Sequence, residues 1–509
     1  MNTTEHRRPA WVRLGVPSVS TCLWLAVFLT LTLSGWRIDM ISADGDSAMH
    51  WAVGNWMIEH REIIRTDPFS FTRAGAPVIT KEWLSEIGFA AAGNWLGWNG
   101  LVLVAAALIA TTLWLLLRQM LAEGTDILLT AALVLLAALS CQIHWAARPH
   151  LVTHLLVVFF AGKLREFARE KLPASQLFAW LVPGTLLWVN LHGAFFIGFV
   201  LIGCYVVAAI IGRVPRVRLQ ALLGLLAACL VVSLLNPNGW KLHAMILEYL
   251  WHPRFVGGVN EFLSPNFHSP TVRGFEVQLL VLGLTLLVAR PRLTVPEIVL
   301  TGVWGYFALH SMRNIPIFCL VLTPILAAHL QVFLRQIDAA WIRSYWRVSA
   351  DVATINRAAG GHLLAGAVIV GLLLALVVPR SSGGRPLLTT EPQPSRFPVE
   401  AVKFVRAQPG TVRGEMFSTD YWGSYLTLTL PEHKVFVDSR LDFYITDFIK
   451  EYVQVATVKP GWADLLDKYG VNWALLPADH RLSVMLGLHS QWQEVYRDEV
   501  AVIYARNTD

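Results

Sequence analysis

Long apolar runs recur along most of the chain, and short polar connections separate them. A helix needs about 20 apolar residues to cross the hydrocarbon core of a bilayer. The pattern therefore predicts about eleven spanning helices: about Val19–Met40, Trp98–Leu117, Ile127–Trp145, Leu151–Lys163, Leu177–Leu191, Ala194–Gly212, Leu219–Leu235, Phe275–Arg290, Val295–His310, Ile315–Arg335 and Leu363–Val378.

Two longer polar stretches and the C-terminal part interrupt this pattern. The predicted division is a transmembrane domain over 1–380 with a large extracytoplasmic loop at 41–97, a linker at 381–397 and a soluble α/β domain at 398–509. In the soluble part, stretches with strand alternation follow stretches with helical spacing. We expect helices at Phe397–Ala407 and Gly461–Tyr469, strands at Thr411–Ser418, Lys434–Asp438 and Val471–Leu476, and a hairpin over Trp492–Ala505.

Basic residues lie in every second connection between the apolar runs. Arg7, Arg8 and Arg13 precede the first run, and an example of a later basic connection is Arg213 to Arg218. Cytoplasmic connections of membrane proteins are rich in Lys and Arg, so we expect a cytoplasmic N-terminus. The first run is longer than the core of a signal peptide and is expected to stay uncleaved. An odd number of spans then places the C-terminal domain outside the cytoplasm.

The composition agrees with a lipid environment. The chain has 509 residues, of which 55% are hydrophobic and only 15% are charged, whereas soluble domains carry about 25% charge. The 21 tryptophans suit a membrane interface. The net charge of +6 does not gather into a basic stripe with interleaved aromatic residues. A bilayer is therefore the expected partner, and nucleic acid is not.

The first extracytoplasmic loop carries the densest group of acidic and histidine residues. Asp44 and Asp46 follow the first span, and His50 shares a face with Asp46 if a helix begins near Ser47. Lys81, Glu82 and Glu86 close the loop. One alternative is that the aspartates only cap an interfacial helix. Capping needs one aspartate, and it does not explain the other members of the group.

Further polar residues mark the outer ends of later spans. Arg148 and His150 lie between the third and fourth spans, His192 lies between the fifth and sixth, and Arg313 lies between the ninth and tenth. Ionisable groups at this depth usually face an internal cavity, which makes each one a site candidate. Anchoring at the lipid headgroups is the alternative for each of them.

Together these features resemble the GT-C superfamily of membrane glycosyltransferases, which includes protein O-mannosyltransferases and lipid A aminoarabinose transferases. The acids after the first span, the long first loop, the number of spans and the outer domain carry the resemblance. The stretch from Asp44 to Glu86, with Asp67–Thr72, and the segments Tyr421–Leu426 and Val435–Arg440 also look like a group of bacterial GT-C-like proteins. The resemblance implies a bacterial inner (plasma) membrane location.

The resemblance also implies a reaction. A sugar would pass from a polyprenyl-phosphate donor to a glycan, lipid or protein acceptor outside the cytoplasm, with inversion. The catalytic acid of the family corresponds to Asp44 or Asp46, with Asp44 favoured as general base. Arg148, Arg313 and Lys81 would hold the phosphate. The remaining candidates would line the cavity: His50, Glu82, His150 and His192.

Asp44-Gly45-Asp46 departs from the adjacent acidic pair of the mannosyltransferases. It has the DxD form, which in oligosaccharyltransferases of the superfamily helps to hold a divalent metal. Asp44 and Asp46 are thus also candidate ligands for Mg²⁺ or Mn²⁺, and metal dependence stays open.

Two other functions use the same features. A transporter or flippase for a lipid-linked glycan would have the charged cavity without the chemistry. A non-catalytic assembly protein for an envelope polysaccharide would use its outer domain to dock partners. Trp422, Tyr425, Asp438 and Arg440 are candidates for such contacts, with core packing and a buried ion pair as the alternative.

Overall fold

The computed structural model describes residues 15–43, 45–251, 260–288, 292–359, 361–377, 389–444 and 447–507. The chain divides into two compact units. A helical unit comprises the chain up to Ser34, Ala105–Trp145 and Pro149–Thr389, and an outer unit comprises Gly35–Val104, Ala146–Arg148 and the chain from Thr390 on. The first loop thus folds with the C-terminal part.

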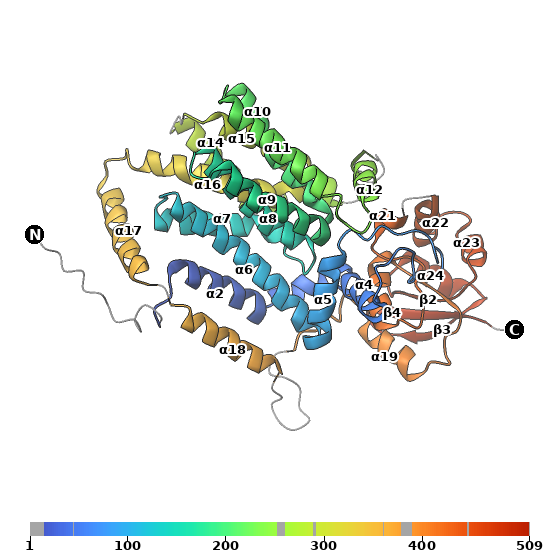
Figure 1. Ribbon diagram of the computed structural model, residues 1–509. Helices are drawn as coiled ribbons and strands as arrows, with labels where there is room; N and C mark the ends of the chain where they lie inside the picture. The colour runs from blue at the N-terminus through green and yellow to red at the C-terminus, as the bar shows by residue number, and fades with distance from the viewer. Residues whose placement is uncertain are drawn as a thin grey trace, which may run out of the picture. The chain divides into compact units, whose positions relative to one another are not determined.

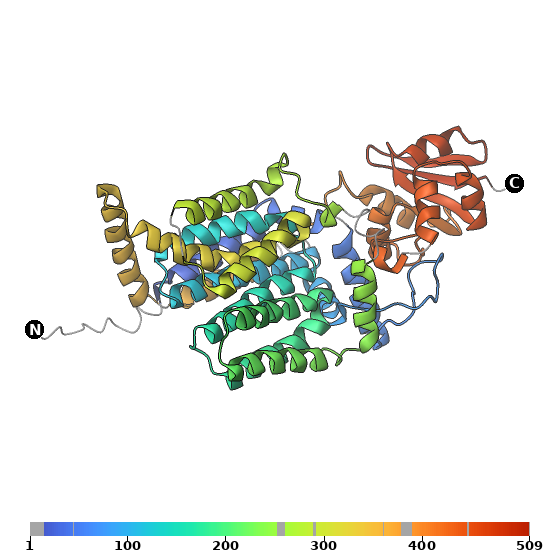
Figure 2. The same cartoon turned by 90° about the horizontal axis from the view of Figure 1, so that it is seen from above.

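The helical unit is a bundle of long apolar helices that pack side by side (Figures 1 and 2). Its elements are α2 (Val19–Leu33), most of α6 (Trp98–Ala122), α7 (Ile127–Cys141), η1 (Gln142–His144), α8 (His150–Ala168), α9 (Ala174–Leu191), η2 (Gly193–Phe195), α10 (Phe196–Ile211), α11 (Arg216–Val232), α12 (Trp240–Trp251), η3 (Asn260–Phe262), η4 (Pro270–Val272), α14 (Arg273–Val288), α15 (Val295–His310), η5 (Met312–Asn314), α16 (Ile315–Leu334), α17 (Ala340–Ala358) and α18 (Leu363–Val377).

Each predicted span contains a helix, but the number of membrane crossings is not confirmed at eleven. Among the described residues, five helical stretches are long and apolar enough to cross, and a bent pair would make a sixth. Several others are shorter, such as α15 with 16 residues, which is about 24 Å long against a hydrocarbon core of about 30 Å. The bundle nevertheless exposes apolar side chains on its surface, for example Leu280, Leu284 and Leu287 of α14. These helices support a location in a membrane.

The first predicted span is not one continuous helix. The helix α2 ends at Leu33, and α3 (Trp36–Ser42) continues at an angle of 69°. The break falls at Ser34-Gly35, where the apolar run contains a small polar residue and a glycine. Both residues favour turns over helix interiors. The prediction that this span reaches Met40 as one helix is therefore wrong.

The outer unit joins the first loop to a small α/β layer. The end of the first predicted span supplies α3, and the first loop supplies α4 (Asp46–His60) and α5 (Trp83–Leu96). The later part supplies α19 (Val399–Ala407), β1 (Glu415–Ser418), α20 (Asp420–Thr429), α21 (Leu441–Tyr444), α22 (Asp447–Ala456), α23 (Trp462–Lys468), β2 (Val471–Pro477), α24 (Arg481–Leu488), β3 (Trp492–Arg497) and β4 (Ala501–Arg506).

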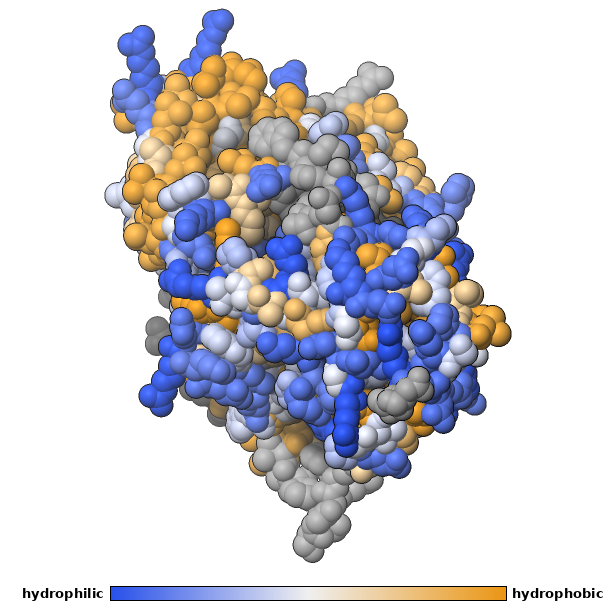
Figure 3. Space-filling view, turned by 90° about the vertical axis from the view of Figure 1, so that its right-hand side faces the viewer, coloured by the Kyte–Doolittle hydropathy of each residue, from blue (hydrophilic) through white to orange (hydrophobic). Residues whose placement is uncertain are grey.

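The four strands form one sheet in the order β1-β2-β4-β3, with β1 parallel to β2 and the other two pairs antiparallel. Side chains of a strand alternate between its faces. Trp473 and Leu475 accordingly enter one core with residues of α19 and α20, while Ala474 and Leu476 enter a second core with residues of α22 and α24. Helices thus cover both faces, and the surface of the layer in Figure 3 is mostly hydrophilic.

Three details of the soluble part differ from the prediction. The first strand is limited to Glu415–Ser418, and Asp420–Thr429 forms a helix that the pattern did not indicate. Lys434–Asp438 is buried from Val435 on but is not a strand, because Val435 forms only an isolated bridge with Ser70 of the first loop. Of the predicted linker at 381–397, residues 381–388 lie outside the described residues.

Candidate functional site

Asp46 meets Arg148 in the outer unit. The Asp46 Oδ2 atom lies 3.1 Å from a guanidinium nitrogen of Arg148, and both side chains remain partly exposed to water. The backbone brings them together, because the Ala147 amide donates to the Met40 carbonyl (2.8 Å) and the Ser47 hydroxyl donates to the Ala147 carbonyl (3.1 Å). Asp46 opens α4 at its first residue and makes no side-chain cap, since the capping position is Gly45. Asp44 lies outside the described residues.

A second cluster lies one helical turn further along α4. The His50 Nδ1 atom is 3.3 Å from Glu86 Oε1 and 3.6 Å from Glu82 Oε2. Glu82 occupies the capping position of α5, and Glu86 follows it by one turn. Both glutamates are buried. Their carboxylates therefore converge on the imidazole from one helix end.

Close contact between the two helices makes this convergence possible. A Cβ atom at Gly54 of α4 would lie 2.0 Å from the backbone oxygen of Glu86 and 2.6 Å from the Cβ atom of Ala90. Only glycine leaves room for α5 at this distance. The backbone of Glu86 thus rests directly against α4.

Burial and charge shift the pKa values of this cluster. Burial opposes the charged form of His50, but the hydrogen bond to Glu86 and the negative charges of Glu82, Glu86 and Asp46 raise the pKa of His50 to about 8. Burial raises the pKa of Glu82, against the opposing effect of His50 and Lys81. The cluster therefore favours a proton or another cation at neutral pH.

The same three side chains fit a divalent cation. One ligand atom from each of His50, Glu82 and Glu86 lies within 4.8 Å of the others. The Glu86 Oε2 atom is buried and has no hydrogen-bond partner among the described residues, which is unusual for a buried carboxylate. One imidazole and two carboxylates suit Zn²⁺ or Mn²⁺. The prediction of Asp44 and Asp46 as metal ligands stays a prediction, with Asp46 paired to Arg148 instead.

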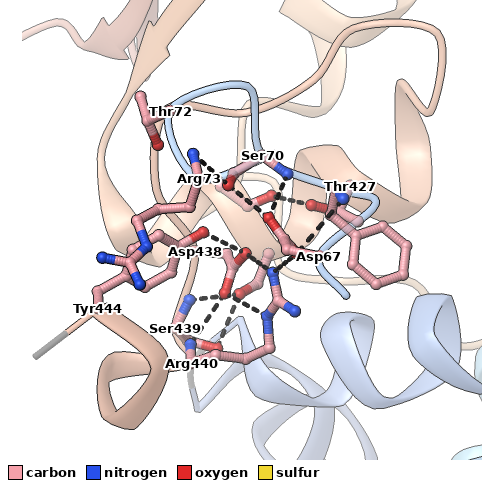
Figure 4. Close-up of polar contacts among 12 residues, drawn as sticks. Asp67, Ser70, Thr72, Arg73, Thr427, Asp438, Ser439, Arg440 and Tyr444 are labelled. Atoms are coloured by element: carbon pink, nitrogen blue, oxygen red, sulfur yellow. Dashed lines mark hydrogen bonds and ion pairs between the residues drawn. The ribbon is translucent and has the colours of Figure 1, made fainter. Parts of the chain in front are cut away.

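Lys81 is held by the C-terminal part of the outer unit. Its ammonium lies 2.8 Å from Asp442 Oδ2. Arg440 lies two residues before Asp442. One of its guanidinium nitrogens is 2.6 Å from an oxygen of Asp67 in the first loop and 2.6 Å from an oxygen of Asp438 (Figure 4). The two aspartate side chains are fully buried. Asp438 and Arg440 thus form the buried ion pair that was the alternative to an exposed binding role.

The helical unit holds the other predicted residues. His150 Nε2 lies 2.7 Å from the His144 carbonyl, and its ring contacts His144 and His154 edge to face. His192 is buried, with Nδ1 2.8 Å from the Thr153 hydroxyl. The guanidinium of Arg313 lies 5.2 Å from the centre of the Phe262 ring.

The predicted residues thus divide between the units. Asp46, His50, Lys81, Glu82 and Arg148 lie in the outer unit, whereas His150, His192 and Arg313 lie in the helical unit.

A cavity of about 700 Å³ opens at the carboxyl ends of β1 and β2. Thr419, Tyr421, Arg396 and Asp479 are among the residues that line it. Tyr421 and Arg396 each donate a hydrogen bond of 3.2 Å to the backbone oxygen of Ser42, shortly before the acidic motif. The carboxyl ends of parallel strands are a common place for ligands.

Comparison with known proteins shows which solved structures share this fold. No family model matches the sequence, and no curated protein matches it. Solved structures do match. The apo oligosaccharyltransferase of Archaeoglobus fulgidus is 12% identical, with a TM-score of 0.56 over 90% of this chain and 69% of the other.

ArnT of Cupriavidus metallidurans, bound to undecaprenyl phosphate, is 15% identical, with a TM-score of 0.53 over 95% of this chain and 97% of the other. The archaeal oligosaccharyltransferase AglB with an inhibitory peptide and dolichol-phosphate is 10% identical, with a TM-score of 0.53 over 96% of this chain and 74% of the other. Both enzymes are GT-C glycosyltransferases. The chain has the GT-C fold. The resemblance inferred from the acidic motif and the long first loop is thereby confirmed for the fold.

The sequence did not predict the partners of three residues of the candidate site, Glu86, Asp67 and Asp442. Glu86 was grouped with the loop acids, but its pairing with His50 depends on the close approach of α4 and α5. Asp67 was noted only as part of the segment Asp67–Thr72, and Asp442 was not noted. The signal that was available for Glu86 is its spacing of four from Glu82, which places both on one helix face.

Proposed function

We propose that the chain is a membrane glycosyltransferase that moves a sugar from a polyprenyl-phosphate donor to an acceptor outside the cytoplasm, with inversion. The ion pair between Asp46 and Arg148 carries the proposal. It joins an acid of the first loop to a phosphate-binding candidate from a distant segment, on a fold that glycosyltransferases share. The proposed location is a bacterial inner membrane, with the N-terminus in the cytoplasm and the outer unit on the opposite side.

The proposed chemistry is a single displacement. The acceptor oxygen attacks the anomeric carbon while a carboxylate takes its proton, and the bond from that carbon to the phosphate oxygen breaks. Asp44 is the favoured base and Asp46 the alternative. The leaving phosphate keeps the electron pair, and Arg148 and Lys81 would stabilise its charge. A guanidinium can serve a carboxylate and a phosphate together because it has five N–H donors.

His50, Glu82 and Glu86 would hold a divalent cation in this enzyme. When bound, such a cation would stabilise negative charge on the donor phosphate. The buried Oε2 atom of Glu86, which has no partner among the described residues, supports the assignment. Glu82 is the neighbour of Lys81 in sequence, so the cation site and the phosphate-binding lysine belong to one end of the loop.

The cavity at the carboxyl ends of β1 and β2 is the proposed acceptor site. It is bounded by hydroxyl, aromatic and charged groups, including Thr419, Tyr421 and Arg396, which suit a polar acceptor such as a glycan or a peptide. Hydrogen bonds from Tyr421 and Arg396 to Ser42 tie this cavity to the backbone that leads into the acids.

Transfer can be measured with the full chain in lipid nanodiscs. The substrates are a panel of undecaprenyl-phosphate sugars, with mass spectrometry of the products. Asp44→Asn or Asp46→Asn is expected to lower transfer by about 10²–10⁴-fold, because a general base contributes that much. Arg148→Gln is expected to lower it by about a hundredfold or more.

Two matched variants control for charge. Asp351→Asn and Arg413→Gln change exposed residues outside the site and are expected to keep full transfer. If both aspartate variants fold and transfer sugar at the wild-type rate, the proposal is wrong. Translocation of the lipid-linked sugar across vesicles without transfer would favour the transporter instead.

A further inference from the structure

The first loop is attached to the C-terminal part through its backbone. Ser70 and Val435 form a parallel bridge. The Phe71 amide donates to the Val435 carbonyl (3.2 Å), and the Val435 amide donates to the Phe69 carbonyl (3.1 Å). The Thr72 hydroxyl donates to the Phe436 carbonyl at 2.6 Å. Residues 69–72 are therefore attached to 435–436 by one isolated bridge and a side-chain hydrogen bond.

A buried charge network holds Asp67, which precedes Ser70 of this bridge by three residues (Figure 4). Asp67 accepts hydrogen bonds from the Ser70 amide (3.0 Å) and hydroxyl (2.5 Å), and its other oxygen pairs with Arg440. Arg440 also donates twice to Asp438, at 2.8 and 2.6 Å, and Tyr444 donates to Asp438 at 2.9 Å. A buried ion is stable only with such partners. The loop position of Asp67 is thus set by Arg440.

The next ion pair of the same segment fixes the end of the loop. Asp442 lies two residues after Arg440 and holds the ammonium of Lys81 at 2.8 Å. Lys81 immediately precedes Glu82, whose carboxylate lies 3.6 Å from His50. The segment Arg440–Asp442, which we term the clamp, therefore forms ion pairs with the loop at Asp67 and at Lys81.

The two ion pairs between the clamp and the loop differ in their exposure to water. Asp67 and Asp438 are sealed from water, whereas the side chains of Lys81 and Asp442 are 31% and 20% exposed. The buried pair of Arg440 and Asp67 suits a permanent structural attachment. The second leaves the ammonium in reach of solvent, where a phosphate oxygen can approach it while Asp442 keeps it in place.

We propose that Asp442 is a positioning residue, through which the C-terminal part presents Lys81 and Glu82 to the polyprenyl-phosphate donor. The outer domain is then an integral part of the enzyme site. This inference rests on the proposed function for the donor, but the attachment of the loop does not depend on it. It assigns to Arg440 the role of anchoring the clamp.

Hydrogen exchange and ligand binding test the proposal with the full chain in nanodiscs. In Asp442→Asn, exchange in peptides covering residues 73–86 is expected to rise about threefold, since a partly exposed ion pair contributes modestly to local stability. Exchange in β2 and β4 is expected to stay unchanged. The dissociation constant for undecaprenyl phosphate is expected to rise about fivefold, because Lys81 is no longer held in place.

Control variants separate positioning from a general loss of structure. Asp467→Asn breaks the pair with Arg506 in the same layer, and neither quantity is expected to change. Asp442→Glu keeps the charge and is expected to recover at least part of both losses. With an active sugar donor, Asp442→Asn is expected to raise KM more than it lowers kcat.

The outcomes distinguish this inference from the proposed function. Wild-type exchange and binding in Asp442→Asn would overturn the positioning role. Weaker binding without faster exchange would also overturn it, because Asp442 would then contact the ligand itself. If the wild-type protein transfers no sugar while Asp442→Asn shows both expected changes, the proposed function fails and the positioning role stands. If Asp442→Asn does not fold, Asp442→Glu and Lys81→Arg give the same comparison.

Discussion

His50 lies between two buried carboxylates, so its charge depends on what else occupies the cluster. Burial alone would favour the neutral imidazole, but the hydrogen bond to Glu86 and the nearby carboxylates favour the charged form and raise the pKa of His50 to about 8. A proton and a divalent cation would neutralise the same carboxylates. At the scale of single residues, the proposed cation site would therefore exchange a proton for a divalent cation, depending on pH and metal supply.

Without metal, His50 is expected to stabilise the folded protein in a pH-dependent way. Its folded pKa of about 8 lies above the ordinary value of 6.5, so its contribution is complete below pH 6.5 and is lost as the pH rises through 8. The contribution is at most about 2 kcal/mol. Thermal unfolding of chelator-treated wild type and His50→Gln should differ more at pH 6 than at pH 9. An equal difference at both values would contradict the raised pKa.

Zinc binding is the second expectation at this scale. Isothermal titration with Zn²⁺ should show one site per chain. Glu86→Gln and His50→Gln should each weaken it by about a hundredfold, because one ligand supplies on the order of 3 kcal/mol. Glu400→Gln, an exposed change on α19, should bind zinc like the wild type. Unchanged affinity in Glu86→Gln would rule out this cluster as the zinc site.

At the scale of elements, the site depends on how closely α4 and α5 pack. The contact is made by Gly54 against the backbone of Glu86, and a second glycine, Gly93 of α5, leaves room for the Trp51 ring. Met49, Val53 and Met57 form the apolar side of the same helix pair. The position of Glu86 is thus set by the spacing of two helices.

Gly54→Ala tests this spacing. The added Cβ atom would lie 2.0 Å from the Glu86 oxygen, so the helices must separate, which costs about 1–3 kcal/mol or more. We expect a lower unfolding temperature and weaker zinc binding. Gly88→Ala on α5 meets no atom within 4 Å and should be neutral or stabilising by up to about 1 kcal/mol. Equal unfolding temperatures for the two variants would contradict the close contact.

At the scale of the whole molecule, each of the two units is built from segments that are not consecutive in the sequence. Gly35–Val104 folds with the residues from Thr390 on, and the helical unit is formed by most of the residues between them. Ala48 of α4 is buried in the same core as Phe397 and Tyr425. The first loop and the α/β layer are therefore one folded body.

Deleting the residues from Thr390 onward should expose the first loop. Arg73 lies 5.0 Å from the centre of the Phe443 ring in the intact outer unit. Without this contact we expect trypsin to cut after Arg73 about tenfold faster, because cleavage follows local opening. Cleavage after Arg343 and Arg347 of α17, in the helical unit, serves as the control. Equal cleavage after Arg73 in both chains would show that the loop folds alone.

The sequence predicts the helical elements well and the tertiary contacts poorly. Val295–His310 was predicted at the bounds that α15 has, because a long apolar run between charged ends has few other solutions in a membrane. The bend at Ser34-Gly35 was missed, since two small residues are weak signals inside an apolar run. Lys434–Asp438 resembles a buried strand in sequence, and only the structure shows that Val435 forms a bridge with Ser70 of the first loop.

The candidate site could be predicted only in part for the same reason. Asp46 and His50 lie on one helix, so their spacing of four already places them together. The pairing of Asp46 with Arg148, or of Lys81 with Asp442, joins segments that no periodicity connects. Such contacts arise from the fold and cannot be read from local pattern.

The hydrogen bond from Thr72 to Phe436 joins residues 364 positions apart. A ribosome that adds about 5–20 residues each second delivers the later partner roughly 20–70 s after the earlier one. During this interval the newly made loop waits with Asp67 lacking the guanidinium that neutralises it in the finished protein. Attachment of the first loop is thus among the last events of biogenesis, and a prematurely released chain carries the acidic motif without the segment Arg440–Asp442.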